Sequence, residues 1–152
     1  GFPICGYHYY VTEPSVYHMV GENAVTYHCA PYNTQSVGFS IDYFPSRDEA
    51  LNIKVHPAVY ENAIRTATML FLKFKVLPVE DSLVGHRELF GTGWFKSKTG
   101  DHVLRKTCPG LAINLSLFRY EVARRCQGIL GLTVDGIIGP KTREAFSKLA
   151  RI

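Results

Sequence analysis

The strongest constraint on the fold is an apolar pattern of helical period in the middle of the chain. Between Pro57 and Pro78, apolar side chains recur every three or four residues, at Val59, Ala63, Ala67, Leu70, Phe71 and Phe74. Proline is tolerated in the first turn of a helix but interrupts its interior, so the two prolines bound the pattern. The pattern predicts one amphipathic helix from residue 57 to the residues before Pro78, with one face buried.

Two segments before this helix have the composition of β-strands. Residues 4–11 are rich in β-branched and aromatic side chains, and residues 36–43 place Val37, Phe39 and Ile41 on one face. Shorter strands are expected at 17–20 and 79–85, and the glycine-rich stretch 87–105 is expected to form a long loop. Strands combined with a long helix predict an α/β fold, with a mixed β-sheet flanked by helices.

The apolar pattern changes after residue 110. Leu117, Val122, Cys126 and Ile129 predict a helix over about 115–130, and the turn-forming run DGIIGP precedes a further helix from Pro140 to about 149. Residues 1–110 contain ten basic and ten acidic side chains, whereas residues 111–152 contain seven and three. We therefore predict a neutral domain over 1–110 and a small basic helical module over 111–152.

Composition narrows the class of protein. Of the 152 residues, 46% are hydrophobic and 20% are charged, which is typical of a soluble domain, and we expect a monomer. No apolar run approaches the roughly 20 residues of a spanning helix, and the first residues lack the pattern of a signal peptide. The net charge of +4 indicates an anionic partner, and the alternative interpretation is that these charges only keep the surface solvated. Nucleic acid is disfavoured, because the basic tail has no aromatic platform.

His86 and Cys108 are the side chains best suited to bind a metal. The four cysteines form no CxxC pair, which excludes a zinc ribbon, and the other three are expected to be buried thiols. A histidine at the end of a buried strand and a cysteine at the far end of a glycine-rich loop can meet at one Zn²⁺. Lys106 adds a cation suited to thiolate formation or oxyanion stabilisation. A histidine with a purely structural hydrogen bond is the alternative for His86.

The segments around these residues resemble the type-2 N-acetylmuramoyl-L-alanine amidases, a family that includes bacteriophage lysins and peptidoglycan-recognition proteins. GHREL at 85–89 and KTCPG at 106–110 are similar to the zinc-binding half of that family. GYHYYV at 6–11, YHCAPYNTQSVGFSID at 27–42 and the long helix follow the family's order. The resemblance implies zinc-dependent hydrolysis of the amide between N-acetylmuramic acid and L-alanine in peptidoglycan.

The resemblance also implies roles for individual residues. His86 and Cys108 match two of the family's three zinc ligands, and Lys106 matches its transition-state lysine. Tyr7 matches the active-site tyrosine, and both Tyr7 and Lys106 would stabilise charge or move protons. We expect His28, at a groove-lining position, and Asn33 to contact the substrate. Members that have another residue at the Cys108 position tend to be binding-only receptors, so this cysteine favours an enzyme.

The family's first zinc ligand has no counterpart in this sequence. It is a histidine on an opening strand, and this chain begins after that point, at GFP. The chain continues upstream in a longer form, or it lacks the ligand, or another histidine such as His8 or His28 substitutes. Because Tyr7 and His8 are neighbours on a predicted strand, their side chains are expected on opposite faces. Two ligands alone would bind zinc weakly, which makes a non-catalytic peptidoglycan-binding protein the alternative function.

Residues 124–142 have a resemblance of their own, to the helical peptidoglycan-binding modules that end many wall hydrolases. It rests on DGIIGPKT followed by an amphipathic helix. It implies a wall-binding tail, whose basic excess suits anionic wall polymers, on a phage-type lysin that acts on the cell wall. The partner of the whole protein is then peptidoglycan, with its glycan strand and stem peptide. A helical hairpin packed on the catalytic body is the alternative for this segment.

Overall fold

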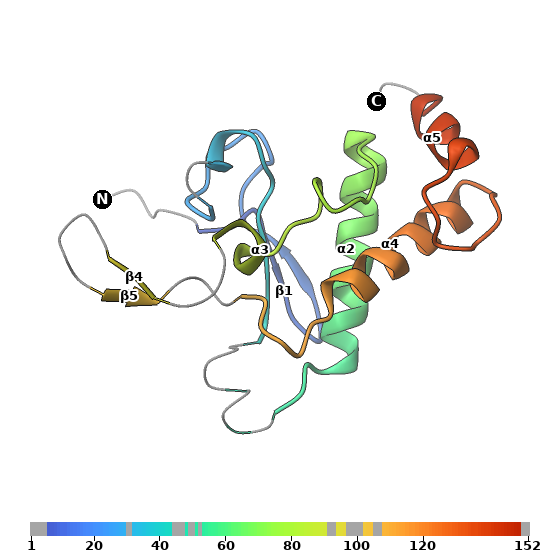
Figure 1. The fold of residues 1–152 in the computed structure, drawn as a ribbon. Helices are drawn as coiled ribbons and strands as arrows, with labels where there is room; N and C mark the ends of the chain where they lie inside the picture. The colour runs from blue at the N-terminus through green and yellow to red at the C-terminus, as the bar shows by residue number, and fades with distance from the viewer. Residues whose placement is uncertain are drawn as a thin grey trace.

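The computed structural model describes residues 6–29, 32–43, 48, 51, 53–90, 94–96, 102–104 and 108–149, with the backbone alone for 90, 94–96 and 102–104. A small sheet lies at the centre, and helices α2 and α4 pack beside it (Figure 1). The predicted α/β class, with a mixed sheet flanked by helices, is confirmed. None of the described helices has the length and apolar character needed to cross a membrane.

The central sheet has the strand order β2-β1-β3. Strand β1 (Tyr9–Val11) pairs antiparallel with β2 (Val16–His18) and parallel with β3 (Phe39–Ile41), so that Tyr10 is opposite both Tyr17 and Ser40. These strands are shorter than the sequence predicts, and residues 4 and 5 lie outside the described part. One face of β1 is buried, with Val11 fully inaccessible to solvent.

Helix α2 (Pro57–Phe74) follows the predicted pattern closely. His56 caps its start, because the Nδ1 atom accepts the backbone N–H of Ala58 at 3.3 Å. At the other end, Lys75 adopts the left-handed conformation that terminates the helix. Ala63, Ala67 and Phe71 on the buried face pack in the core with Val11 of the sheet.

The segment before His86 is not a strand, which corrects the prediction for 79–85. The amide N–H groups of Ser82 and Leu83 both donate to the carbonyl of Val79 at 3.0 Å, so this chain segment turns back on itself. The hydroxyl of Ser82 satisfies further backbone groups at 77 and 79. Local hydrogen bonds therefore replace the ladder bonds that a strand would need.

The region predicted as one long loop, 87–105, contains regular structure. Helix α3 (His86–Phe90) opens it, and strands β4 (Trp94–Lys96) and β5 (His102–Leu104) form an antiparallel hairpin. His86 is thus the first residue of a short helix rather than the last residue of a strand. In Figure 1 the hairpin extends away from α2 and α4.

The C-terminal segment forms helices α4 (Leu115–Ile129) and α5 (Pro140–Ser147), close to the predicted ranges. Phe118, Val122 and Cys126 of α4, together with Phe146 of α5, belong to the same apolar core as α2 and the sheet. The boundary near residue 111 remains a prediction, but the segments on its two sides share one core.

The turn between α4 and α5 is organised by one buried amide. Gln127 is 1% exposed, and its amide nitrogen donates to Asp135 Oδ1 at 2.8 Å and to the carbonyl of Ile137 at 3.0 Å. Its amide oxygen accepts the N–H of Gly136 at 2.8 Å. Gly136 has φ of 74°, and a Cβ there would lie 2.2 Å from the Tyr120 ring. The DGIIGP run therefore needs glycine at 136 both for conformation and for space.

Candidate active site

His86 and Cys108 meet although 22 residues separate them in the chain. His86 Nδ1 lies 3.1 Å from Cys108 Sγ. The other ring nitrogen, Nε2, donates to the backbone carbonyl of His28. Because a carbonyl only accepts hydrogen bonds, Nε2 carries the proton and Nδ1 presents its lone pair toward the sulfur. The arrangement brings together an imidazole nitrogen and a thiol, both of which are good ligands for a transition metal.

Arg87 ties the start of α3 to the segment that carries Cys108. Its backbone N–H donates to the carbonyl of Cys108 at 3.1 Å. Its guanidinium donates to the carbonyls of Gly110 and, at 2.8 Å, Ile113. Gly85 makes this approach possible, because a Cβ there would lie 2.8 Å from two neighbouring side chains. His86 and Cys108 are therefore held by contacts on either side of them.

Arg119 connects α4 to the same short helix. Its side chain is 9% exposed, and its Nε donates to the carbonyl of Leu83 at 2.8 Å. One terminal nitrogen forms an ion pair with Glu88, whose carboxylate also accepts the N–H of Gly85 at 2.9 Å. Glu88 thus caps α3 and pairs with Arg119 through the same oxygen atom. Helix α4, in the segment predicted to be a separate module, supports the geometry around His86.

His8 is buried and committed to structural hydrogen bonds. It is fully inaccessible to solvent; its Nε2 donates to the carbonyl of Ala24 at 3.0 Å, and its Nδ1 accepts the N–H of Gly38 at 3.1 Å. Tyr7 beside it is 37% exposed. With both ring nitrogens engaged, His8 is not available to a metal, which argues against it as the substitute zinc ligand.

His28 lies next to His86, and its surroundings lower the pKa of its ring. Burial lowers its pKa, and the nearby rings of His8 and His86 lower it further, against a backbone hydrogen bond at Thr26 that raises it. Its Nδ1 lies 2.7 Å from the hydroxyl of Thr26, and its Nε2 lies 2.8 Å from that of Ser36. The structure brings the carbonyl of His28, rather than its ring, to His86.

The remaining predicted site residues are Asn33 and Lys106. The side-chain oxygen of Asn33 accepts the N–H of Cys29 at 2.6 Å, so this atom holds a turn of the backbone. Cys29 is buried, and this burial raises the pKa of its thiol, with a further contribution from Cys108. Lys106 lies outside the described residues.

The residues present fit one half of a zinc site. Bond lengths of about 2.0–2.1 Å to nitrogen and about 2.3 Å to sulfur separate two tetrahedral ligands by about 3.5 Å. The observed 3.1 Å between His86 Nδ1 and Cys108 Sγ would have to open only slightly. The hydrogen bond from Nε2 to the carbonyl of His28 is the kind of outer contact that orients metal-binding histidines. Within the described part of the chain, no group of three or more His, Cys, Asp or Glu side chains gathers around a common point.

Comparison with known protein families identifies the family of the chain. The family model described as N-acetylmuramoyl-L-alanine amidase matches residues 3–111. The chain belongs to this family. The amidase assignment implies a hydrolase that acts on peptidoglycan in the cell wall, and zinc is common among its members. Comparisons with curated proteins and with solved structures gave no significant match.

The sequence analysis does not identify the side chains that support the candidate site. Arg119 is one of the basic residues of the tail, yet it lies on the apolar stripe of α4, four residues after Leu115 and three before Val122. An ionised group on a buried stripe needs a partner, and that signal was readable in the sequence. The partner itself, Glu88, is 31 residues away in the chain and could be identified only from the fold.

Proposed function

We propose that this chain is a zinc-dependent N-acetylmuramoyl-L-alanine amidase, which hydrolyses the amide between the lactyl group of N-acetylmuramic acid and L-alanine. The observation that carries the proposal is the contact between His86 Nδ1 and Cys108 Sγ, with the opposite ring nitrogen bound to a backbone carbonyl. Membership of the amidase family over residues 3–111 supplies the class of reaction.

In this proposal His86 and Cys108 hold the metal, and a third ligand comes from outside the described side chains. Bound zinc polarises an amide carbonyl and lowers the pKa of a water molecule. Cys108 must lose its proton to become a ligand, which ties metal affinity to pH. The hydrogen bond to the carbonyl of His28 keeps the ring of His86 in the tautomer that can bind through Nδ1.

Two further residues complete the proposed chemistry. Hydrolysis adds one water to the amide, leaving a lactyl carboxylate and the free amino group of L-alanine. In this proposal the ammonium of Lys106 stabilises negative charge on the reacting oxygen, and the phenol of Tyr7 donates a proton. The exposure of Tyr7, at 37%, leaves it accessible to a substrate. His28 and Asn33 are proposed as substrate contacts.

The tail is proposed to assist this reaction as a peptidoglycan-binding module of a phage-type lysin. DGIIGPKT and the following helix carry this proposal. Two basic residues of the tail join it to residues 1–110: Arg119 pairs with Glu88, and Arg125 pairs with Glu61.

The experiment measures cleavage and metal content together. The protein with about one zinc per chain should release new L-alanine amino termini from purified cell wall and create no new reducing ends. The variants Cys108→Ser and His86→Ala should lose both zinc and cleavage, whereas His18→Gln, which changes an exposed histidine on β2, should retain them. A wild-type protein that binds zinc but releases no L-alanine amino termini would refute the enzyme proposal.

The alternative, a non-catalytic peptidoglycan-binding protein, has one observation in its favour. Among the described side chains, His86 and Cys108 come together but are not part of any group of three or more candidate ligands. It predicts that the protein sediments with purified wall, holds far less than one zinc per chain and cleaves no amide. The same measurements therefore decide between the two functions.

A further inference from the structure

The peptide unit between His28 and Cys29 is hydrogen-bonded at both of its polar ends. Its carbonyl oxygen accepts the Nε2–H of His86. Its N–H group, which belongs to Cys29, donates to the Oδ1 atom of Asn33 at 2.6 Å. Because a peptide unit is planar, one of its ends cannot rotate without moving the other. A side chain on one loop is therefore connected, through a single rigid amide, to the ring of His86.

The direction of these bonds extends the connection to the metal pair. The carbonyl of His28 only accepts, so Nε2 of His86 carries the proton, and Nδ1 presents its lone pair 3.1 Å from Cys108 Sγ. Hydrogen bonds in a chain polarise one another, so the bond from Cys29 to Asn33 makes the carbonyl of His28 a stronger acceptor. A strong and fixed acceptor favours the tautomer of His86 that can bind a metal through Nδ1.

The ring of His28 is held separately, which limits how far the peptide unit can turn. Ser36 donates its hydroxyl proton to the carbonyl of Tyr32 at 2.7 Å. The Oγ atom of Ser36 therefore accepts a proton from Nε2 of His28, at 2.8 Å. On the other side of the ring, Nδ1 lies 2.7 Å from the hydroxyl of Thr26, a residue that is 1% exposed. The carbonyl of His28 thus belongs to a residue whose side chain is fixed at both nitrogens.

Asn33 is placed for this contact by the backbone around it. It lies in the short 3-10 helix η1 (Tyr32–Thr34). The N–H of Tyr32 donates to the carbonyl of Cys29 at 2.6 Å, so the chain folds back on the peptide unit that Asn33 contacts. Only the Oδ1 atom of the side chain makes the contact with Cys29, and the amide NH₂ group is a separate donor.

We infer that Asn33 is a positioning residue for the candidate metal site: through the peptide unit between His28 and Cys29, its Oδ1 atom fixes the orientation and tautomer of His86. The inference rests on the proposed amidase function for the identity of the metal. The substrate contact proposed for Asn33 then belongs to its NH₂ group, so the two roles fall on different atoms of one side chain.

Two substitutions separate the two roles. Asn33→Ala removes the acceptor, whereas Asn33→Asp keeps an acceptor oxygen and loses the NH₂ group. Competition with a chelator of known strength measures zinc affinity, and nitrogen NMR of the zinc-free protein shows which ring nitrogen of His86 is protonated. Asn33→Ala should bind zinc about tenfold more weakly, as for the loss of an outer contact of a metal site, and should populate both tautomers. Asn33→Asp should retain the zinc affinity and the Nε2–H tautomer of the wild-type protein.

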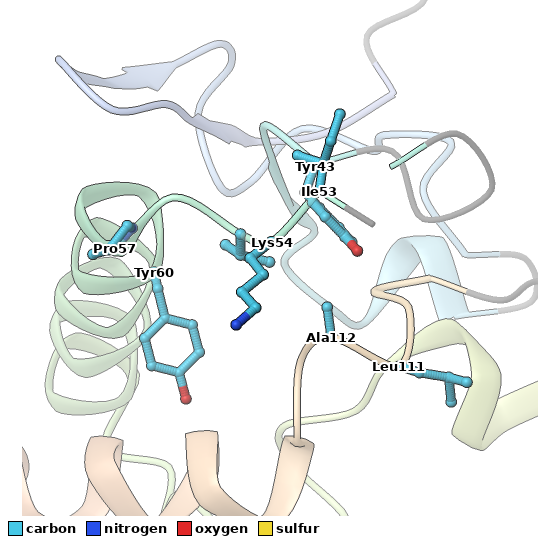
Figure 2. A pocket seen from close by; sticks show the side chains of 8 residues that line it. Tyr43, Ile53, Lys54, Pro57, Tyr60, Leu111 and Ala112 are labelled. Atoms are coloured by element: carbon cyan, nitrogen blue, oxygen red, sulfur yellow. The ribbon is translucent and has the colours of Figure 1, made fainter. Parts of the chain in front are cut away.

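Two control variants test whether the effect is specific. Asn23→Ala replaces an exposed asparagine that lies before the same peptide unit in the chain. Leu111→Ala replaces a side chain that is 81% exposed in the wall of the open hollow shown in Figure 2, three residues after Cys108. Both variants should bind zinc like the wild-type protein and keep His86 in the Nε2–H form. A loss in Leu111→Ala as large as that in Asn33→Ala would indicate general loosening of the Cys108 segment and would overturn the inference.

The inference and the amidase proposal fail in different ways. Unchanged zinc affinity and an unchanged His86 tautomer in Asn33→Ala refute the positioning role, and so do equal losses in Asn33→Ala and Asn33→Asp. A wild-type protein that binds zinc but cleaves no amide refutes the enzyme and leaves the positioning role standing. If the wild-type protein binds no zinc, the tautomer of His86 in the zinc-free variants decides alone. If urea unfolding shows that Asn33→Ala is not folded, Asn33→Gln, which displaces the acceptor by one methylene, replaces it with the same expected results.

Discussion

Replacement of Arg119 by methionine should destabilise the protein and loosen the candidate site. Methionine keeps most of the apolar stem but removes the guanidinium. The carboxylate of Glu88 and the carbonyl of Leu83 then lose a donor in a region where the arginine side chain is only 9% exposed. The side chain of Glu88 is 32% exposed, and water can replace part of the lost interaction.

The magnitude follows from this partial burial. Removing one partner of a fully buried ion pair costs about 3–5 kcal/mol, so about 2–3 kcal/mol is expected here. The free energy of unfolding of a domain of this size falls by about 2 kcal/mol per molar urea, so the midpoint of urea unfolding should fall by about 1 M or slightly more. Metal affinity should also fall, by about tenfold or more, because Arg119 and Glu88 hold the short helix that carries His86 outside the proposed metal site.

Arg125→Met is the matched control, because Arg125 also joins α4 to α2 by an ion pair. Its guanidinium forms two bonds to Glu61, at 2.6 and 3.0 Å, but the two side chains are 36% and 48% exposed. An exposed pair of this kind contributes about 0–1 kcal/mol, and metal affinity should not change. Equal urea midpoints for the two variants would refute the reasoning. So would a double-mutant cycle between Arg119→Met and Glu88→Gln with no coupling energy.

Three other predictions follow from contacts away from the metal pair. Gly38→Ala should lower the free energy of unfolding by about 1–3 kcal/mol and reduce cleavage, because a Cβ at residue 38 would lie 2.4 Å from the His28 ring. The control is Gly21→Ala, whose Cβ would meet no atom within 4 Å, and it should change neither stability nor cleavage. The pKa of Glu22 is lowered to about 2, chiefly by Lys73 and then by Tyr9. Its contribution to stability is therefore complete above about pH 4.5 and lost as the pH falls toward 2, and in acid titrations Lys73→Met should flatten this loss. Gln127→Leu should leave the N–H of Gly136 without its acceptor and lower the free energy of unfolding by about 1–3 kcal/mol. It should also speed tryptic cleavage at Lys141. The control Gln35→Leu changes an exposed side chain and should have neither effect.

Local features of the sequence were enough to place the three longer helices, α2, α4 and α5. The periodic apolar residues and Pro57 define α2, and an equally regular apolar pattern defines α4. The structure adds the cap of α4, because the Asn114 side chain accepts the N–H of Leu117 at 3.0 Å. Such signals lie within a few residues of one another, so no knowledge of the fold is required to interpret them. The strand patterns and the helix patterns together also predict the α/β class, which the mixed sheet confirms.

The segment before His86 could not be predicted in the same way. Its apolar residues, Val79, Leu83 and Val84, fit a short buried strand as well as a turn, because burial alone does not specify backbone conformation. Hydrogen bonds of Ser82 to the backbone decide the matter in favour of turns. His86 consequently begins a helix, and its ring faces Cys108 from there.

The sequence by itself determined the chemistry available to this protein: an imidazole, a thiol and a lysine in an order that resembles the amidases. The tertiary structure decided which groups meet. It placed His86 against Cys108, assigned His8 to the core and engaged Arg119 of α4 beside the site. The physical reason is that residue types and local periods are properties of short segments, whereas contacts across 22 or 31 residues depend on how those segments share one buried core.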